Sequence, residues 1–152
     1  MRATLCEIIH NSKLLLQLKS AGKFGEGKWN GPGGKLKQDE TPVDGVKREV
    51  REETGLTILD PELLGLIDFY FGEKHQPDWT TYIFRVTEYS GELRDSDEGI
   101  LRWFKLGEIP YNQMWADDQY WLPPLLEGRK VKGTFWYNEE STELLRHELQ
   151  IE

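Results

Sequence analysis

Three glutamates, Glu49, Glu52 and Glu53, are the residues whose type and spacing point most directly to chemistry. On a helix these positions lie three and four residues apart, so their carboxylates project from one face. Like charges at this spacing each destabilise an isolated helix by about 0.2–0.5 kcal/mol, so the group calls for a compensating cation. Hard carboxylate oxygens favour Mg²⁺ or Mn²⁺, which can also bind phosphate oxygens, and the neighbouring Arg48 can pair with one carboxylate and orient it. The plain alternative is a solvated acidic face.

Helix signals surround these acids. Thr41 is a suitable N-cap, Pro42 suits the first helical position, and Asp44 adds an acid to the first turn. Gly55 is a typical stop residue. We therefore predict a helix from about Pro42 to Thr54, which carries all three glutamates.

The other elements that position this helix are mainly strands. Two aliphatic runs around the turn-forming pair Asn11-Ser12 predict a hairpin, and residues 20–34, with six glycines, predict a loop that can approach a ligand closely. A second helix is expected to begin at Asp117 or Asp118 and to reach Leu126, shortened or kinked by its two prolines. The predicted strands are Thr4–His10, Lys13–Lys19, Leu64–Phe71, Thr80–Val86, Leu101–Leu106, Val131–Tyr137 and Leu144–Ile151. This order favours an α/β or α+β sandwich.

Bulk composition limits the classes of protein that need considering. The 152 residues fit a single domain, residues 1–152, and the single Cys6 cannot form an internal disulfide, which favours an intracellular, cytoplasmic protein. No apolar run reaches the length of a membrane span. A net charge of -8 argues against binding a nucleic acid polymer, although residues 1–37 hold seven basic residues against two acids. That basic segment is either a solvated surface or a rim that faces phosphate.

The acids of the predicted helix belong to a longer motif. The matching positions are Gly34, Glu40, Arg48, Glu49, Val50, Glu52, Glu53, Gly55 and Leu56. In residue type and spacing this string resembles the Nudix box of the Nudix hydrolases. The resemblance implies a Nudix fold, with a mixed central β-sheet between helices and a loop-helix-loop that binds metal and diphosphate.

The same resemblance implies roles for individual residues. The backbone carbonyl of Gly33 and the carboxylates of Glu49, Glu52 and Glu53 would hold Mg²⁺, or Mn²⁺, together with an acid from a later loop. Glu98 is the candidate for that acid, with Asp97 as the fallback, and the alternative for Glu98 is an ordinary exposed loop position. Metal lowers the pKa of bound water, and Glu53 or Glu98 would then accept its proton.

Outside the box the chain resembles the subgroup of oxidised purine nucleoside triphosphate hydrolases, which act on 8-oxo-dGTP and 2-hydroxy-dATP. The similarity covers nearly the whole chain and is clearest in FGEGKWNGPGGK (residues 24–35) and MWADDQYW (residues 114–121). It implies release of the monophosphate and pyrophosphate from a small-molecule nucleotide, sanitising the nucleotide pool. We expect a monomer that binds no membrane. Pro32, Ala116 and Gly99 depart from the subgroup pattern, which makes the base preference less secure than the reaction type.

Residue by residue, the resemblance implies that Asn30, Asp117 and Asp118 hydrogen-bond the purine edge while Trp115 stacks on its face. Two neighbouring carboxyl groups in a half-buried pocket tend to share a proton, so one can donate while the other accepts. The lining residues implied by the same comparison are Phe69 and Phe71, with Thr4 on the base side and Lys19 on the phosphate side. The alternatives are a helix cap for the aspartates and core packing for the aromatic residues.

Two rival functions remain open on the sequence. Another Nudix activity, on ADP-ribose, NADH or a dinucleoside polyphosphate, is possible because the box specifies diphosphate chemistry and not the base. A catalytically silent nucleotide-binding sensor on the same fold is the other class, and the presence of every box acid argues against it.

Overall fold

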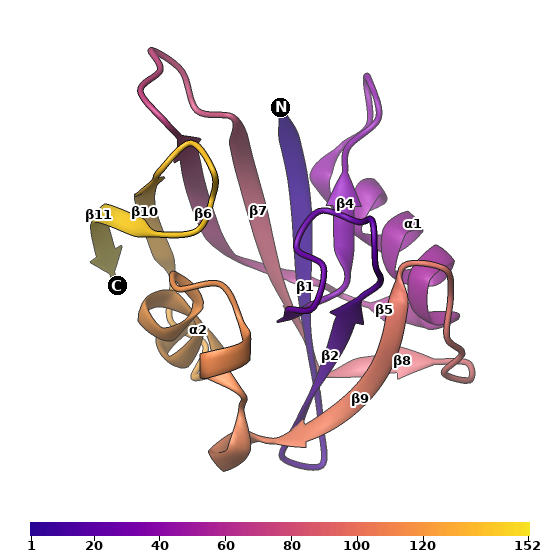
Figure 1. Cartoon of the computed structure of the whole chain (residues 1–152). Helices are drawn as coiled ribbons and strands as arrows, with labels where there is room; N and C mark the ends of the chain where they lie inside the picture. The colour runs from indigo at the N-terminus through magenta and orange to yellow at the C-terminus, as the bar shows by residue number, and fades with distance from the viewer.

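The computed structural model describes residues 1–152. Nine of its strands form one curved array between two helices (Figure 1), and two short strands pair in a separate sheet. The strands are β1 (Arg2–His10), β2 (Lys13–Lys19), β3 (Trp29–Asn30), β4 (Gly33–Lys35), β5 (Thr57–Leu59), β6 (Glu62–Phe71), β7 (Trp79–Val86), β8 (Glu88–Ser90), β9 (Gly99–Lys105), β10 (Val131–Tyr137) and β11 (Leu144–Ile151). The helices are α1 (Pro42–Thr54) and α2 (Asp118–Leu126), with short 3-10 turns η1 (Leu106–Glu108) and η2 (Tyr111–Gln113).

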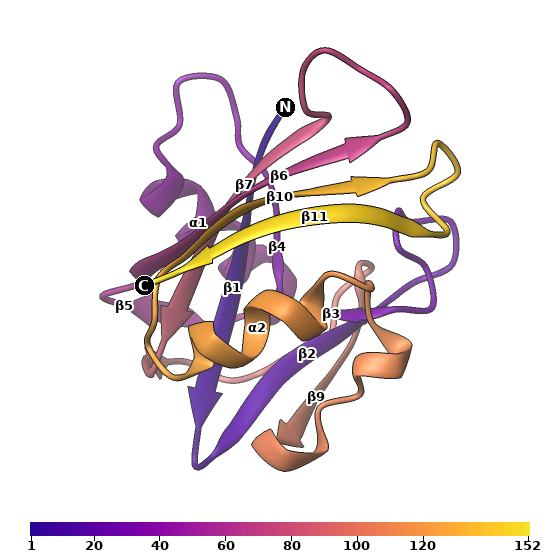
Figure 2. The same cartoon turned by 90° about the vertical axis from the view of Figure 1, so that its left-hand side faces the viewer.

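The array is a mixed sheet, as expected. Its order is β11-β10-β6-β7-β1-β2-β3, with β4 paired to β1 and β9 paired to β2. The β1/β7 and β6/β10 pairs are parallel, whereas the β6/β7, β10/β11 and β2/β9 pairs are antiparallel. Strand β1 contacts β2 only near the hairpin turn, where Ile9 faces Leu14 and His10 faces Lys13. The two strands diverge beyond that turn (Figure 2).

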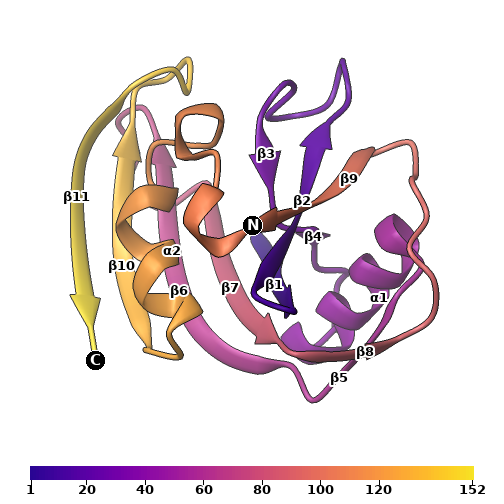
Figure 3. The same cartoon turned by 90° about the horizontal axis from the view of Figure 1, so that it is seen from below.

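The helices lie on opposite sides of the central strands (Figure 3). Each side has its own apolar core. Toward α1, the buried side chains include Cys6, Val46 and Phe84; toward α2, they include Trp121, Leu125 and Phe135. A helix-covered sheet buries both faces, which explains why β1 and β2 read as nearly continuous aliphatic runs.

The predicted bounds of α1 are confirmed. The Thr41 side chain accepts a hydrogen bond from the backbone N–H of Asp44 at 3.1 Å, and Pro42 occupies the first turn. Gly55 adopts a left-handed conformation with φ of 81°, and its N–H donates to the carbonyl of Arg51. The helix therefore ends one residue after Glu53, which lies in its last turn beside the β4 backbone.

Some local expectations need correction. The glycine-rich segment 20–34 is not wholly a loop, because β3 and the beginning of β4 lie within it. The short pair β5 and β8 was not predicted from the sequence, since three-residue strands leave little periodic signal. Helix α2 does reach Leu126 with Pro123 and Pro124 inside it. The hairpin turn is as expected: Asn11 and Ser12 both have positive φ, the backbone of a two-residue hairpin loop.

Candidate functional site

A cavity of about 740 Å³ lies between β1, β6, β7 and β10 on one side and the α1 and β2 ends on the other. This volume is typical of small-molecule sites. Its lining residues are Ala3, Thr4, Leu5, Lys19, Lys23, Phe24, Asn30, Gly31, Gly33, Gly34, Lys35, Glu49, Glu53, Phe69, Phe71, Trp79, Thr81, Glu98, Trp115, Asp117, Asp118 and Tyr137. The cavity thus joins residues from both halves of the chain, with an acidic end at α1 and an aromatic end near α2.

The acidic end is built around Glu53. Its side chain is only 4% exposed, and the Gly33 N–H donates to its Oε2 at 2.8 Å. The Lys19 ammonium lies 3.5 Å from Glu53 and 3.8 Å from Glu98, and Lys23 lies 3.4 Å from Glu98. Burial raises the pKa of Glu53 to about 7, against the opposing effect of the Lys19 charge and the Gly33 hydrogen bond. The basic residues of the N-terminal segment therefore meet the acids here.

Glu49 and Glu53 hold the β4 backbone closely. A Cβ added at Gly34 would lie 2.7 Å from Glu49 Oε2, so only glycine leaves room for that carboxylate. A Cβ at Gly33, whose φ is 155°, would lie 2.1 Å from the carbonyl oxygen of Thr4. Gly34 thus lets the Glu49 carboxylate approach β4, and Gly33 lets the β4 backbone approach β1.

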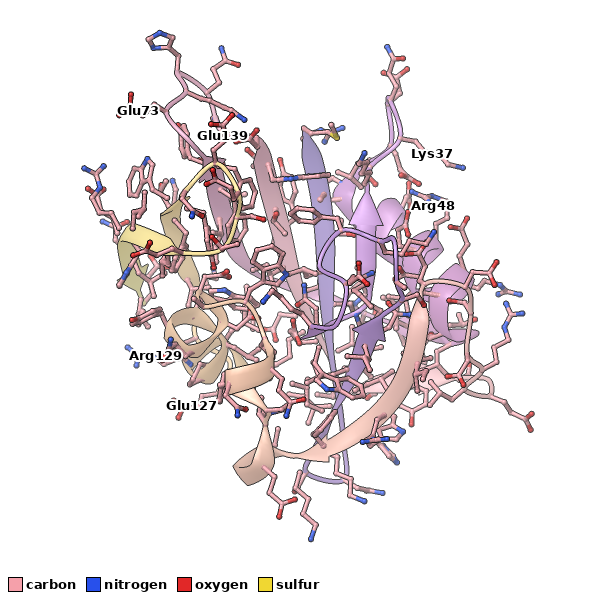
Figure 4. All side chains as sticks on the ribbon, in the orientation of Figure 1. Lys37, Arg48, Glu73, Glu127, Arg129 and Glu139 are labelled. Carbon is pink, nitrogen blue, oxygen red and sulfur yellow. The ribbon has the colours of Figure 1, made fainter.

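Arg48 organises the remaining acids of the box. Its guanidinium binds Glu40 at 2.7 Å, Glu49 at 2.8 Å and Glu52 at 3.2 Å. The hydrogen bond from Arg48 is the main reason that the pKa of Glu40 falls to about 2. Figure 4 shows Arg48 on the α1 side of the molecule, the side that also carries Lys37. Glu52 is 57% exposed and does not line the cavity, so only two of the three helix glutamates do.

The donor set fits a hard divalent cation. Glu49, Glu53 and Glu98 line one cavity beside the backbone of Gly33, and carboxylate and carbonyl oxygens are the ligands that Mg²⁺ prefers. No three acidic, imidazole or thiol side chains of the chain converge closely enough to form a preassembled cage. Lys19 instead lies between Glu53 and Glu98, where its ammonium offsets their charge.

The opposite end of the cavity is aromatic. Trp115 stacks on Phe24 with ring centroids 5.2 Å apart and meets Tyr137 edge-on at 5.6 Å. Phe71 lies 5.5 Å from Tyr137 and 5.9 Å from Phe24, while Phe69 stacks on Phe135 behind the wall. The phenylalanine Phe24 is 61% exposed, so the wall reaches the cavity mouth. Flat apolar walls of this kind suit a planar heterocycle.

Two buried aspartates interrupt that aromatic wall. Asp117 is 3% and Asp118 is 2% exposed, and both line the cavity. Asp117 occupies the N-cap position of α2, but its side chain makes no capping hydrogen bond, so the alternative interpretation of this side chain as a helix cap is wrong. Its oxygens are bound instead by the Tyr137 hydroxyl and by the Trp121 indole N–H, the latter at 2.7 Å. Asn30 lines the same end and its side-chain oxygen accepts the Gly31 N–H at 3.0 Å.

The cavity thus contains every residue for which the sequence suggested contact with substrate. Of the expected metal ligands, the cavity contains Gly33, Glu49, Glu53 and Glu98 but not Glu52. Arg48, which was expected to orient a carboxylate, also lies outside the cavity lining. Thr4, on β1, donates its hydroxyl hydrogen bond to the Gly34 carbonyl at 3.4 Å. Pro32 and Gly99, at two of the departures from the subgroup pattern, do not line the cavity.

Sequence reasoning missed a buried polar cluster behind the aspartates. Glu7 is 1% exposed, and burial raises its pKa to about 8. Glu7 Oε2, Gln17 Nε2 and Asp118 Oδ2 have no hydrogen-bond partner in the chain. A Cβ at Gly31 would lie 2.8 Å from Glu7 Oε1, so this cluster adjoins the chain next to Asn30. The available signal was a glutamate inside residues 3–9, whose other members are aliphatic except for Thr4 and Cys6.

Comparisons with known proteins agree with the fold and the motif. The NUDIX domain family model matches residues 1–125, so the chain belongs to the Nudix hydrolase family and is an enzyme. Within that family it is 40% identical over 147 residues to the oxidized purine nucleoside triphosphate hydrolase of Danio rerio, covering 96% of this chain and 92% of that protein. The protein of the same name from Mus musculus is 39% identical, with coverage of 91% and 88%.

The solved structures give the same fold. A crystal structure of the mutator MutT protein from Bacillus halodurans superposes with a TM-score of 0.88 and 34% sequence identity, covering 98% of this chain and 97% of that one. The expected Nudix fold is therefore confirmed. Neither helix of the chain has the length and apolar character required to cross a bilayer.

Proposed function

We propose that this Nudix hydrolase converts oxidised purine nucleoside triphosphates, such as 8-oxo-dGTP and 2-hydroxy-dATP, to the monophosphate and pyrophosphate. One observation carries the proposal: a single cavity joins Glu49 and Glu53 of the Nudix box to an aromatic end with buried hydrogen-bonding groups. The names of the Danio rerio and Mus musculus relatives support the same substrate class. The role follows from the reaction, which removes damaged precursors from the nucleotide pool.

In this proposal the acidic end of the cavity binds the phosphate chain and cleaves it. Gly33, Glu49, Glu53 and Glu98 would hold Mg²⁺, with Mn²⁺ as a substitute, and Glu52 would join them after exchange of its exposed contact with Arg48. The metal would supply charge neutralisation for the phosphate chain and acidify a bound water. Arg48 is the positioning residue, because it fixes Glu49 from outside the cavity.

In this proposal the chain's own carboxylates accept the proton of the attacking water. Glu53 or Glu98 accepts the proton of the attacking water as the α,β-anhydride opens, and the bridging oxygen leaves with one of the two phosphate groups. Lys19 and Lys23 lie within 4 Å of these acids. They bind the phosphate oxygens and stabilise the negative charge that develops on them in the transition state.

The aromatic end of the cavity selects the base of the nucleotide. Trp115, Phe69 and Phe71 pack on the heterocycle, and Asn30 with Asp117 and Asp118 reads its edge. Oxidation of guanine places a hydrogen on N7, a new donor that a carboxylate or amide oxygen can accept. A buried group left unpaired by the undamaged base costs affinity, so hydrogen bonding at this site gives stronger discrimination than shape alone.

The reaction is tested by incubating the purified chain with 8-oxo-dGTP in Mg²⁺ and separating the products by anion exchange. The expected products are the monophosphate and pyrophosphate, formed only with the divalent ion. A substrate panel with ADP-ribose, NADH and a dinucleoside polyphosphate distinguishes the rival Nudix activities by kcat/KM. Faster cleavage of ADP-ribose than of any oxidised purine triphosphate would overturn the substrate assignment.

Three broader expectations remain predictions. We propose that residues 1–152 act as one domain, that the chain is a monomer that binds no nucleic acid polymer and no membrane, and that it works in the cytoplasm beside the precursor pool. Light scattering coupled to gel filtration measures whether the chain is a monomer and whether added nucleic acid or vesicles bind it. Cell fractionation measures the location.

A further inference from the structure

The carboxylate of Asp117 is held from two sides by buried donors. The Tyr137 hydroxyl, on β10, donates to Asp117 Oδ1, and the Trp121 indole N–H, on α2, donates to Oδ2 at 2.7 Å. The Asp117 backbone N–H donates in turn to the Tyr137 oxygen at 3.0 Å. Tyr137 is 2% and Trp121 is 0% exposed, so water competes for neither bond.

These bonds assign a charge to Asp117. An indole N–H can only donate. The Tyr137 oxygen already accepts the backbone N–H, and its single hydrogen is directed to Oδ1. Burial raises the pKa of Asp117, and these two donors oppose that effect by stabilising the ionised carboxylate. Hydrogen bonds to a charged group are the stronger kind. Each oxygen of Asp117 keeps a free lone pair that can accept from a ligand.

The neighbouring Asp118 is in the opposite situation. Its Oδ2 has no partner in the chain. Asp117 from the turn before α2, Glu7 from β1 and Tyr111 from η2 are the titratable groups around it. Burial, and then the charge of Asp117, raise the pKa of Asp118 well above its ordinary value. The shared proton therefore stays on Asp118, which lines the cavity as the donor of the pair.

We propose that Tyr137 is a positioning residue that fixes Asp117 as the acceptor and Asp118 as the donor, and so makes the pocket discriminate between 6-oxopurines and 6-aminopurines. The inference rests on the proposed function and adds to it the residue that sets base preference. Without the Tyr137 hydroxyl the proton could move between the two aspartates at lower cost, and the pocket would accept either order of donor and acceptor.

The chemistry of the bases makes the distinction measurable. 8-Oxoguanine carries an acceptor at C6 followed by donors at N1 and the C2 amino group. 2-Hydroxyadenine, in its keto form, carries a donor amino group at C6, a donor at N1 and an acceptor at C2. The two edges present donor and acceptor in opposite order, so one fixed pair of aspartates matches only one of them in a given orientation.

The test compares the native chain with Tyr137→Phe, which keeps the buried ring and removes only the hydroxyl. Tyr70→Phe is the matched control, since the Tyr70 ring stacks on Trp136 in the same sheet and is absent from the cavity lining. The measured quantity is the ratio of kcat/KM for 8-oxo-dGTP to that for 2-hydroxy-dATP between pH 6 and pH 8. The ratio of dissociation constants for the two monophosphates, from calorimetry, gives a second reading that does not require hydrolysis.

The native ratio should depart from unity, and Tyr137→Phe should move both ratios toward unity by about ten-fold, the effect of one hydrogen bond to a charged group. Tyr70→Phe should keep the native ratios. Equal losses for both nucleotides, or unchanged ratios, would overturn the inference while leaving the proposed function standing. A shifted monophosphate ratio in a chain that hydrolyses neither triphosphate would support the inference and refute the proposed function.

Discussion

Replacing Glu7 by Gln should make the protein's stability less sensitive to pH. Glu7 lies on β1, is 1% exposed, and has an oxygen with no partner. Burial raises the pKa of this carboxyl from 4.5 to about 8 in the folded chain. The folded state therefore keeps a proton that the unfolded state releases, and stability falls as pH rises between these two values.

The magnitude follows from the two pKa values. Their contribution is intact below pH 4.5, declines as pH rises, and is fully lost above pH 8. Integrating the linkage relation from pH 5 to pH 8 gives a loss of roughly 3.5 kcal/mol. Glu7→Gln has no proton to release, so its free energy of unfolding should exceed the native value by an amount that grows with pH.

Urea denaturation of both chains at several pH values between 5 and 8 measures this difference. The comparison at equal pH cancels titrating groups that the two chains share, apart from those in contact with Glu7. Glu140→Gln, at an exposed position, controls for the loss of one acid from the chain. A difference between Glu7→Gln and the native chain that stays constant over this range would refute the assignment of Glu7 as a buried neutral acid.

Three further outcomes are expected. Glu53→Gln should lower the turnover of 8-oxo-dGTP by about 100-fold or more while the melting temperature and circular dichroism stay near native, because a ligand or base is lost; turnover within a factor of a few of native would remove Glu53 from either role. Asn30→Ala should reduce the preference for 8-oxo-dGTP over dGTP, measured as kcat/KM, while some hydrolysis persists; equal losses on both nucleotides would make Asn30 structural. Thr41→Ala should cost about 1 kcal/mol of unfolding free energy by urea titration, since it removes the N-cap of α1; an unchanged value would mean that water caps the helix equally well.

Local signals explain why much of the fold was predictable. The bounds of α1 follow from Thr41, Pro42 and Gly55, each of which acts through its own backbone preference or capping bond. The hairpin after β1 follows in the same way from Asn11 and Ser12. Such residues act over a few positions of the chain, so their effect can be read without knowing the tertiary structure.

The remaining features depend on partners that are distant in sequence. The Tyr137 contact with Asp117 joins residues 20 positions apart. Glu7 lies directly beside Gly31, which lines the cavity. The sequence suggested an Asp117 cap because aspartate often caps helices, but two buried donors bind its carboxylate instead. Strands as short as β5 depend on pairing with β8, which no local pattern reveals.

The site was predictable to the extent that it matched a known motif. Glu49 and Glu53 line the cavity as the box implies, whereas Glu52 is engaged by Arg48 at the surface. The Arg48 contacts depend on side-chain directions on α1 and on the loop that carries Glu40, which spacing along the chain does not specify.

The central claim is that one cavity couples the phosphate chemistry of the box to selection of a damaged purine. The most direct measurement is kcat/KM for 8-oxo-dGTP and for dGTP in the same Mg²⁺ buffer with the native chain. We predict a preference of at least ten-fold for the oxidised nucleotide, the scale set by one additional hydrogen bond in a buried site. Equal values for the two nucleotides, or a preference for dGTP, would contradict the claim.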